Sequence, residues 1–345
     1  MTSLFPGDPR LGLTGHAGLV ESDGLWLPVR LPGAGGRPLL PEGLAAAARM
    51  ASGVHADLVT DATGLSWTVE VTAPDAARRA PAPFDVVVGE ERIARIVLGQ
   101  KRGTLRVTGF GPGTKRIRIW LPQYGTTRLG RLTLEGATGA AAAPGGPRWI
   151  AYGSSLTHCT GADGPSDTWP ALVAARLGWR LRNLGFAREC HLDPQVARFV
   201  RDSPAEVISI CAGVNVHGAS TFGRRTFGPA LAGFVQTVRE GHPGVPLVLI
   251  SPMAAPEREG RVNAAGLTLA DVRHIVHDTA AALRDAGEDD LHLVDGLEVL
   301  GPRDAGLLTD GLHPGPDGYR LMADRLAPRL SAFAGQPSTA GPLEP

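Results

Sequence analysis

The fold of this chain is decided by the stretch Ile150-Ala151-Tyr152-Gly153-Ser154-Ser155-Leu156-Thr157, in which an apolar run ends in a glycine-serine turn. Four further strand candidates rich in apolar residues follow at 181–184, 207–211, 247–250 and 291–294. Amphipathic segments predict helices at 168–177, 194–200, 227–240, 269–285 and 317–333. Near-continuous apolar strands that alternate with helices indicate a parallel sheet covered on both faces. We therefore predict an α/β domain over residues 148–334.

The region before residue 140 has a different pattern, of short strand-like runs separated by turn residues. These runs lie at 25–31, 65–71, 84–88, 92–98, 104–108, 115–121 and 128–134. Residues 65–71 alternate apolar and polar side chains, as half-buried antiparallel strands do. We predict a jelly-roll-like β-sandwich over 1–140 and an Ala/Gly/Pro-rich linker over 141–147. Residues 335–345 are expected to form a disordered tail.

Length, charge and cysteine content limit the number of domains, the partners and the cellular compartment that we expect for this protein. The 345 residues predict two domains. Lys+Arg and Asp+Glu both number 34, which argues against nucleic acid or an anionic membrane as partner. The chain start lacks the pattern of a signal peptide, and the three cysteines are odd in number with no CxxC spacing. We expect a cytoplasmic protein with buried free thiols; the oligomeric state stays open.

Residues able to support nucleophilic chemistry follow the predicted strands. Ser155 lies in the turn after the first strand, and Asp310 and His313 lie three residues apart before the last helix. A serine hydroxyl is a poor nucleophile at neutral pH, so it needs a base, and the base needs a group that orients it. Since sites form at the carboxyl ends of parallel strands, we predict Ser155 as nucleophile, His313 as base and Asp310 as its orienting partner.

Two more residues at strand ends could stabilise negative charge on a reacting oxygen. Gly185 follows the second strand and offers a backbone N–H, and Asn215 follows the third strand and offers a side-chain amide. Together with the N–H of Ser155, these groups predict an oxyanion hole formed by Ser155, Gly185 and Asn215.

Four short motifs make the chain resemble the SGNH (GDSL-type) hydrolase superfamily. The first is Gly153-Ser154-Ser155-Leu156, the second contains Gly185, the third is Gly213-Val214-Asn215-Val216, and the last runs from Asp310 to His313. Ser154 and Val216 replace two aspartates of the family pattern. The resemblance implies a flavodoxin-like three-layer α/β/α domain. The run 117–122 also resembles the N-terminal β-sandwich of a bacterial subgroup that includes esterases and acyltransferases.

The resemblance implies a reaction through an acyl-enzyme on Ser155, with no metal and no organic cofactor. We predict an esterase that cleaves a small-molecule carboxylic ester. The alternative is an acyltransferase that moves an acyl group from an ester or thioester to an alcohol of a small molecule, such as a secondary metabolite or a sugar. A third hypothesis, from another class, is a non-catalytic carbohydrate-binding protein.

Several other side chains are candidates for substrate contact, each with a structural alternative. These candidates are Ser154, His158, His217, Trp120 and Tyr124. The alternatives are a helix cap or tight turn for Ser154, a structural role for His158, sandwich core for Trp120 and a surface turn for Tyr124. His274 and His277 lie one helical turn apart with Asp271 nearby, which could bind a metal, but a polar helix face explains them as well.

Overall fold

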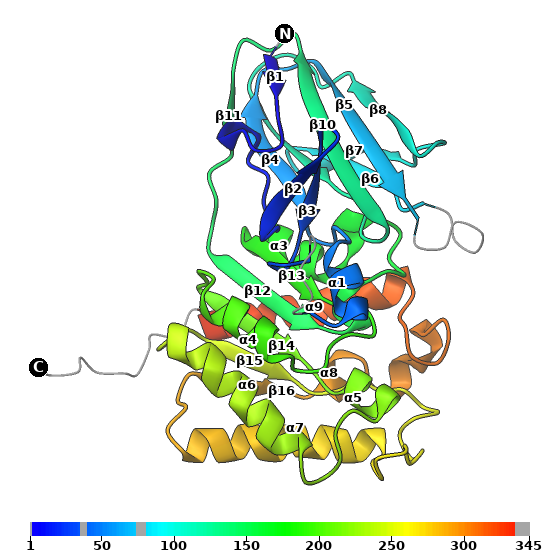
Figure 1. The fold of residues 1–345 in the computed structure, drawn as a ribbon, viewed down its shortest axis with the longest axis vertical. Helices are drawn as coiled ribbons and strands as arrows, with labels where there is room; N and C mark the ends of the chain where they lie inside the picture. Colours follow the sequence, from blue (N-terminus) through cyan, green and yellow to red (C-terminus); the bar gives the residue numbers. More distant parts are fainter. Residues whose placement is uncertain (1, 35–39, 74–80, 335–345) are drawn as a thin grey trace, which may run out of the picture. The chain divides into compact units, whose positions relative to one another are not determined.

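The computed structural model describes residues 2–34, 40–73 and 81–334, so the predicted tail at 335–345 lies outside the described residues. The chain divides into two compact units (Figure 1). The first unit contains Met1–Gly146 and Asp163–Ala171, and the second contains Pro147–Ala162 and Leu172–Pro345.

The first unit holds two antiparallel sheets, as the alternating sequence pattern predicts. One sheet has the order β2-β3-β10-β5-β8, with β1 also paired to β10. Its strands are β1 (Thr2–Leu4), β2 (Gly18–Ser22), β3 (Leu25–Val29), β5 (Gly64–Thr72), β8 (Arg102–Thr108) and β10 (Thr126–Glu135). The other sheet has the order β11-β4-β9-β6-β7. Its strands are β4 (His55–Thr60), β6 (Phe84–Val88), β7 (Glu91–Ile96), β9 (Lys115–Trp120) and β11 (Ala140–Ala142).

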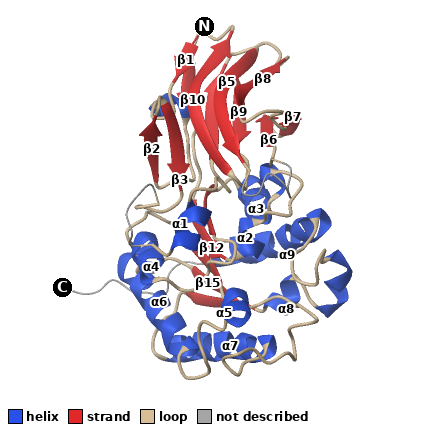
Figure 2. Cartoon of the chain, turned by 45° about the vertical axis from the view of Figure 1, so that its right-hand side comes forward, coloured by secondary structure: helices blue, strands red, loops and turns tan. Residues whose placement is uncertain are grey.

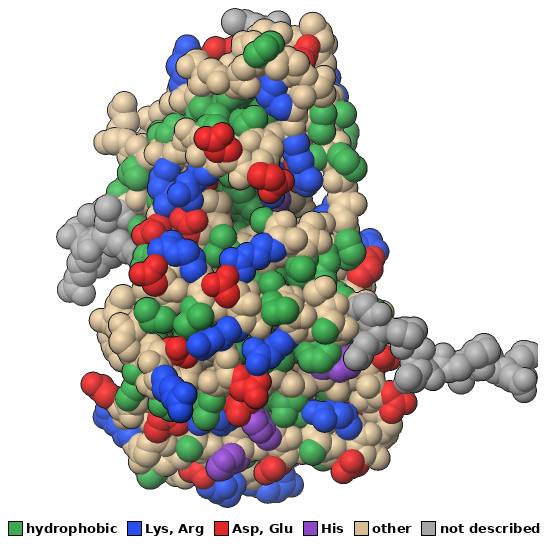
Figure 3. Space-filling view, turned by 180° about the vertical axis from the view of Figure 1, so that it is seen from behind, with side chains coloured by type: hydrophobic (Ala, Val, Ile, Leu, Met, Phe, Trp, Pro, Cys, Tyr) green, Lys and Arg blue, Asp and Glu red, His purple; other side chains and the backbone are tan. Residues whose placement is uncertain are grey.

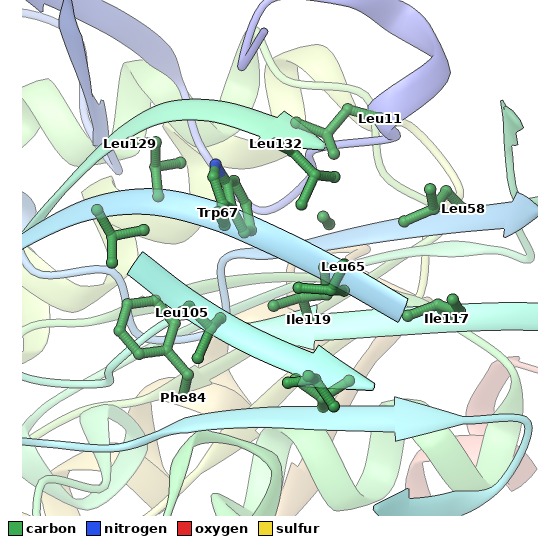
Figure 4. Close-up of a cluster of buried hydrophobic side chains, with 14 of the residues drawn as sticks. Leu11, Leu58, Leu65, Trp67, Phe84, Leu105, Ile117, Ile119, Leu129 and Leu132 are labelled. Atoms are coloured by element: carbon green, nitrogen blue, oxygen red, sulfur yellow. The ribbon is translucent and has the colours of Figure 1, made fainter. Parts of the chain in front are cut away.

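Apolar side chains from both sheets of the first unit form one core (Figure 4). Leu65 and Trp67 of β5 point inward with Ile117 and Ile119 of β9, and all four are fully buried. The Trp67 indole N–H donates to the carbonyl of Gly130 (3.1 Å), so the ring is buried without an unpaired donor. Each such side chain contributes roughly 1.5–3 kcal/mol of transfer free energy to the unit's stability.

The second unit contains a five-stranded parallel sheet with the order β13-β12-β14-β15-β16. Its strands are β12 (Arg148–Gly153), β13 (Arg180–Gly185), β14 (Val207–Cys211), β15 (Leu247–Ile250) and β16 (Leu291–Val294). Numbered along the chain, this order is 2-1-3-4-5, the flavodoxin-like arrangement, which confirms the predicted fold class. Gly153 pairs with Gly185 on one side and Cys211 on the other. The carboxyl ends of three strands therefore meet around Gly153.

Helices cover both faces of this sheet. Figure 1 shows α4 and α6 in front of the strands and α9 behind them, and Figure 2 shows α3 beside α9. Arg176 of α3 and Asp324 of α9 form an ion pair (2.6 Å). The α-helices of the chain are α1 (Glu42–Ala48), α2 (Ser155–His158), α3 (Trp169–Leu177), α4 (Pro194–Arg201), α5 (Val214–Ala219), α6 (Phe227–Gly241), α7 (Leu269–Asp285), α8 (Gly296–Val299) and α9 (Pro316–Ala334). The 3₁₀ helices are η1 (Pro9–Leu11), η2 (Pro165–Asp167) and η3 (Pro302–Leu307).

The surface carries both signs of charge. On the face in Figure 3, Lys and Arg side chains lie interspersed with Asp and Glu, consistent with the neutral formal charge. Among the described helices, none has the length and apolar character needed to cross a bilayer.

Candidate active site

Ser155 lies where β12 passes into the short helix α2. Ser154 caps that helix, since its hydroxyl accepts the N–H of Leu156 (3.3 Å). A side chain at Gly153 would place its Cβ 2.2 Å from the Thr157 hydroxyl, so the turn requires glycine there. Ser155 is the first residue of α2, where a backbone N–H has no partner within the helix. Its side chain remains reachable in a largely buried setting, with 6% of the residue exposed.

A chain of two hydrogen bonds joins Ser155 to Asp310 through His313. The Ser155 hydroxyl lies 2.9 Å from His313 Nε2, and His313 Nδ1 lies 2.7 Å from the Asp310 carboxylate. Because an ionised carboxylate can only accept, Nδ1 carries the proton and donates it to Asp310. Nε2 is then the unprotonated nitrogen and accepts the hydroxyl proton of Ser155. This arrangement can activate a serine for attack on a carbonyl carbon.

The loop before α9 holds Asp310 and His313 in place. The Asp310 carboxylate also accepts the backbone N–H groups of Leu312 (3.1 Å) and His313 (2.7 Å). Thr309 closes the loop from the other side by donating its N–H to the His313 carbonyl (2.8 Å). Partial burial acts to raise the pKa of Asp310, but the hydrogen bonds from His313 outweigh it and hold that pKa below its usual value. The carboxylate therefore stays ionised at neutral pH.

Asn215 is the second residue of α5, which begins directly after β14. Its Oδ1 atom accepts the backbone N–H of Cys190 (3.1 Å). This contact fixes the orientation of the amide and leaves Nδ2 as the end that can donate elsewhere. The neighbouring Gly213 has a φ of +119°, and a Cβ there would lie 2.8 Å from Pro252 and Val272. The turn that places Asn215 therefore depends on glycine as well.

The Gly185 N–H, which the sequence predicted as an oxyanion donor, has a partner in this structure. This N–H already donates to Asn183 Oδ1 (2.7 Å) in a buried setting, so this group is not available to an oxyanion. A Cβ at Gly185 would lie 2.2 Å from the His158 backbone nitrogen. Gly185 thus lets β13 and α2 approach closely, which is a packing role.

Both units of the chain are similar to known proteins. Residues 151–321 match the model of the GDSL-like Lipase/Acylhydrolase family, and residues 11–129 match the SsfX3 N-terminal domain. The chain is 34% identical to a solved structure described as salicylyl-acyltransferase SsfX3 from a tetracycline biosynthetic pathway. That similarity covers 98% of both chains with a TM-score of 0.89. The chain belongs to the GDSL-like lipase/acylhydrolase family.

More distant structures share the fold of this GDSL family member. A putative GDSL-like lipase from Bacteroides ovatus is 18% identical over 96% of this chain and 97% of its own, with a TM-score of 0.78. A family two carbohydrate esterase from Clostridium thermocellum is 16% identical over 82% and 93%, with a TM-score of 0.66. Comparison with curated protein sequences gives no match. Membership of the family makes the protein an enzyme, either an esterase or an acyltransferase.

Three of the predicted substrate contacts in this GDSL-family domain are buried. Ser154 and His158 are fully buried, and His158 Nδ1 accepts the N–H of Ala187 (3.2 Å). His217 is 5% exposed, and its Nε2 donates to the carbonyl of Arg261 (3.0 Å). These hydrogen bonds and the burial give all three residues structural roles.

The two aromatic candidates belong to the β-sandwich unit. Trp120 is 3% exposed and stacks on His55 with 4.0 Å between ring centroids. Tyr124 is 9% exposed. Trp120 is therefore a packed residue of its own unit, as its structural alternative predicts.

Two residues that support the GDSL-type site were not predicted from the sequence. Asn183 accepts the Gly185 N–H and donates its Nδ2 to the Thr157 carbonyl (3.0 Å), which ties the end of β13 to the helix that carries Ser155. There was little signal for Asn183 in the sequence, because β13 also contains Arg180 and Arg182. Cys190 orients Asn215 through its backbone, so its side-chain type gave no signal.

The histidine pair considered as a metal site lies on α7. Asp271 accepts from Thr268 at the start of the helix and pairs with Arg224 (2.7 Å). These contacts hold the pKa of Asp271 well below its usual value. His277 Nε2 lies 3.1 Å from the Ser251 hydroxyl. In the part of the chain that the structure describes, no three His, Cys, Asp or Glu side chains group together so as to hold a metal ion.

Reagents that modify thiols are expected to leave activity unchanged. Cys159, Cys190 and Cys211 are free and buried, which confirms the prediction of buried free thiols. Burial raises the pKa of Cys211 to about 12 and raises that of Cys190 further. Thiolates are therefore scarce at pH 8, and iodoacetamide should add to the thiols only after unfolding. Intact mass and p-nitrophenyl ester turnover, measured together, test this; inactivation by a single adduct on the folded protein would contradict it.

Proposed function

We propose that this chain catalyses acyl transfer through an ester on Ser155. The Ser155 oxygen attacks the carbonyl carbon of an ester or thioester while His313 Nε2 takes the hydroxyl proton. Collapse of the tetrahedral intermediate expels the alcohol or thiol, which takes that proton from His313. The observation that supports this proposal is the pair of hydrogen bonds from Ser155 to His313 (2.9 Å) and from His313 to Asp310 (2.7 Å).

The proposed oxyanion hole consists of the Ser155 N–H and the Asn215 amide. Ser155 offers an N–H from the first residue of α2, and Cys190 orients Asn215 so that Nδ2 is the donating end. Donors fixed in place before the reaction stabilise the negative charge that develops on the carbonyl oxygen. Gly185 is left out of this proposal because Asn183 already accepts its N–H.

The second half of the reaction needs an acceptor for the acyl group. Hydrolysis, the prediction from the sequence, uses water. Transfer to the hydroxyl of a small organic molecule is the second candidate, and the similarity to a salicylyl-acyltransferase over 98% of both chains favours it. In either case His313 takes the proton of the attacking hydroxyl, and Ser155 leaves with a proton from His313. The non-catalytic alternative is disfavoured by the hydrogen-bonded serine.

Trapping the acyl-enzyme distinguishes these reactions. The protein is mixed with a panel of p-nitrophenyl esters and acyl-CoA thioesters, including an aromatic acyl group, and intact mass is followed over time. We expect one acyl adduct per chain on the wild type and none on Ser155→Ala. Release accelerated by an added alcohol, with the new ester as product, identifies an acyltransferase, whereas release by water alone identifies an esterase. A turnover-competent protein whose adduct persists in Ser155→Ala would contradict the proposed nucleophile.

A further inference from the structure

A pocket of about 350 Å³ lies between α5 and the loop from β15 to α7. Its lining includes His217 and Ser220 from the α5 side and Arg258, Arg261 and Asn263 from the loop. We refer to these five residues as the arginine pocket. No Asp or Glu contributes to its lining.

Hydrogen bonds across the arginine pocket fix its walls. His217 donates Nε2–H to the Arg261 carbonyl (3.0 Å), and Asn263 donates Nδ2–H to the His217 carbonyl (2.9 Å). The Ser220 hydroxyl accepts the N–H of Ala264 (3.1 Å). The loop is therefore held against α5 by three bonds, so a ligand would meet a site that is already formed.

The two arginines of the pocket differ from the nearby Arg273 in their ion pairing. Within the described ranges, neither Arg258 nor Arg261 forms an ion pair, whereas the nearby Arg273 pairs with Glu259 (2.9 Å). A Cβ at Gly218 would lie 3.2 Å from Arg258 Nη1, so the missing side chain gives the guanidinium room beside α5. Two arginine residues without ion pairs in one pocket match the charge of a phosphate or carboxylate.

The elements that form the arginine pocket also lie next to elements that carry the proposed site. Asn215 precedes His217 by two residues on α5, a separation within one helical turn of about 5 Å. Glu257, next to Arg258 in the chain, lies close to the loop that carries Asp310 and His313, since a Cβ at Gly311 would be 3.8 Å from its carboxyl carbon. Helix α5 thus carries both Asn215 and a wall of the pocket, and the pocket loop borders the loop of Asp310 and His313.

We infer that the arginine pocket binds an anionic oxygen group of the substrate, a phosphate or a carboxylate. This inference rests on the proposed function, because it assigns the pocket to the substrate of Ser155. A phosphate would belong to the carrier of a thioester donor, and a carboxylate would belong to the acceptor. The same two guanidinium groups recognise either one.

Calorimetric titration of the Ser155→Ala protein with pyrophosphate and, separately, with citrate at low ionic strength tests binding without turnover. We expect at least one probe to bind, and its affinity to fall at least tenfold in R258Q/R261Q because charge-assisted hydrogen bonds are lost. R320Q is the matched control, since it removes one positive charge from α9, where Arg320 pairs with Asp317. The affinity of R320Q for the same probe should stay within twofold of the affinity of the protein without that substitution. No binding up to 10 mM, or equal affinity in R258Q/R261Q, overturns the inference.

Kinetics on the otherwise wild-type protein identify the source of the anion. A rise in KM for an acyl-CoA thioester in R258Q/R261Q, with KM for the matching p-nitrophenyl ester unchanged, assigns the pocket to the donor's phosphates. Citrate binding that depends on the arginines, with both KM values unchanged, assigns it to a carboxylate of the acceptor. Failure of the proposed nucleophile would leave the calorimetric result unchanged, so the two proposals fail separately.

Discussion

Ser155→Ala is expected to lower kcat/KM by a factor of about 10⁴–10⁶, the range found when a serine nucleophile is removed from enzymes of this chemistry. The variant lacks the oxygen that lies 2.9 Å from His313 Nε2, and no other hydroxyl takes its place in that hydrogen bond. Labelling with a serine-reactive fluorophosphonate, read by intact mass, should disappear together with ester turnover. Folding should be preserved, because a Ser→Ala change in α2 adds no volume.

Ser154→Ala is the matched control for this prediction. Ser154 is fully buried and caps α2, so its loss should cost about 1 kcal/mol of stability but leave fluorophosphonate labelling intact. Loss of labelling in Ser154→Ala with full labelling of Ser155→Ala would show that the other serine is the nucleophile.

Asn215→Ala is expected to lower kcat by about 10²–10³, equivalent to roughly 3–4 kcal/mol of transition-state stabilisation. The change removes the Nδ2 donor and also the Oδ1 atom that accepts the Cys190 N–H. Loss of that hydrogen bond costs about 1 kcal/mol of stability, so the melting temperature should fall only slightly. Steady-state kinetics and thermal unfolding, measured on the same preparation, separate the two effects.

Asn215→Asp distinguishes a direct role from support of the Cys190 loop. Aspartate keeps an oxygen that can accept the Cys190 N–H, but it has no N–H to donate and carries a negative charge. If Asn215 stabilises an oxyanion, the aspartate variant should lose at least as much activity as the alanine variant. Near wild-type activity in Asn215→Asp would mean that the residue only holds the loop.

The parallel sheet could be predicted because its strands are buried on both faces. The run 207–211 is apolar except for Ser209, all five residues are buried, and β14 has the same bounds, Val207–Cys211. The strands of the β-sandwich were predicted less completely, and β4 was missed. His55 and Asp57 interrupt the pattern of β4, and His55 is nevertheless buried against Trp120. The helices α2, α5 and α8 have four to six residues, too few to show helical periodicity.

Those site residues whose role depends on side-chain chemistry could be predicted from the sequence. Ser155, Asp310 and His313 were identified as a nucleophile, an acid and a base by type and order, and the hydrogen bonds between them follow that assignment. The hydrogen-bond partner of the Gly185 N–H could not be predicted, because it depends on the conformation of a neighbour. Only the folded chain reveals that Asn183 turns its amide oxygen toward that group.

The loop from Asp310 to His313 determines which nitrogen of His313 can exchange protons with the substrate. Asp310 accepts hydrogen bonds from both the ring and the backbone of His313, and these two bonds do not involve Ser155. In the proposed reaction one nitrogen, Nε2, therefore handles every proton of both half-reactions, and no ring flip is needed between them. An acyl donor and an acyl acceptor of different size can then react in turn at the same site, provided that each places its reacting oxygen or sulfur beside His313 Nε2.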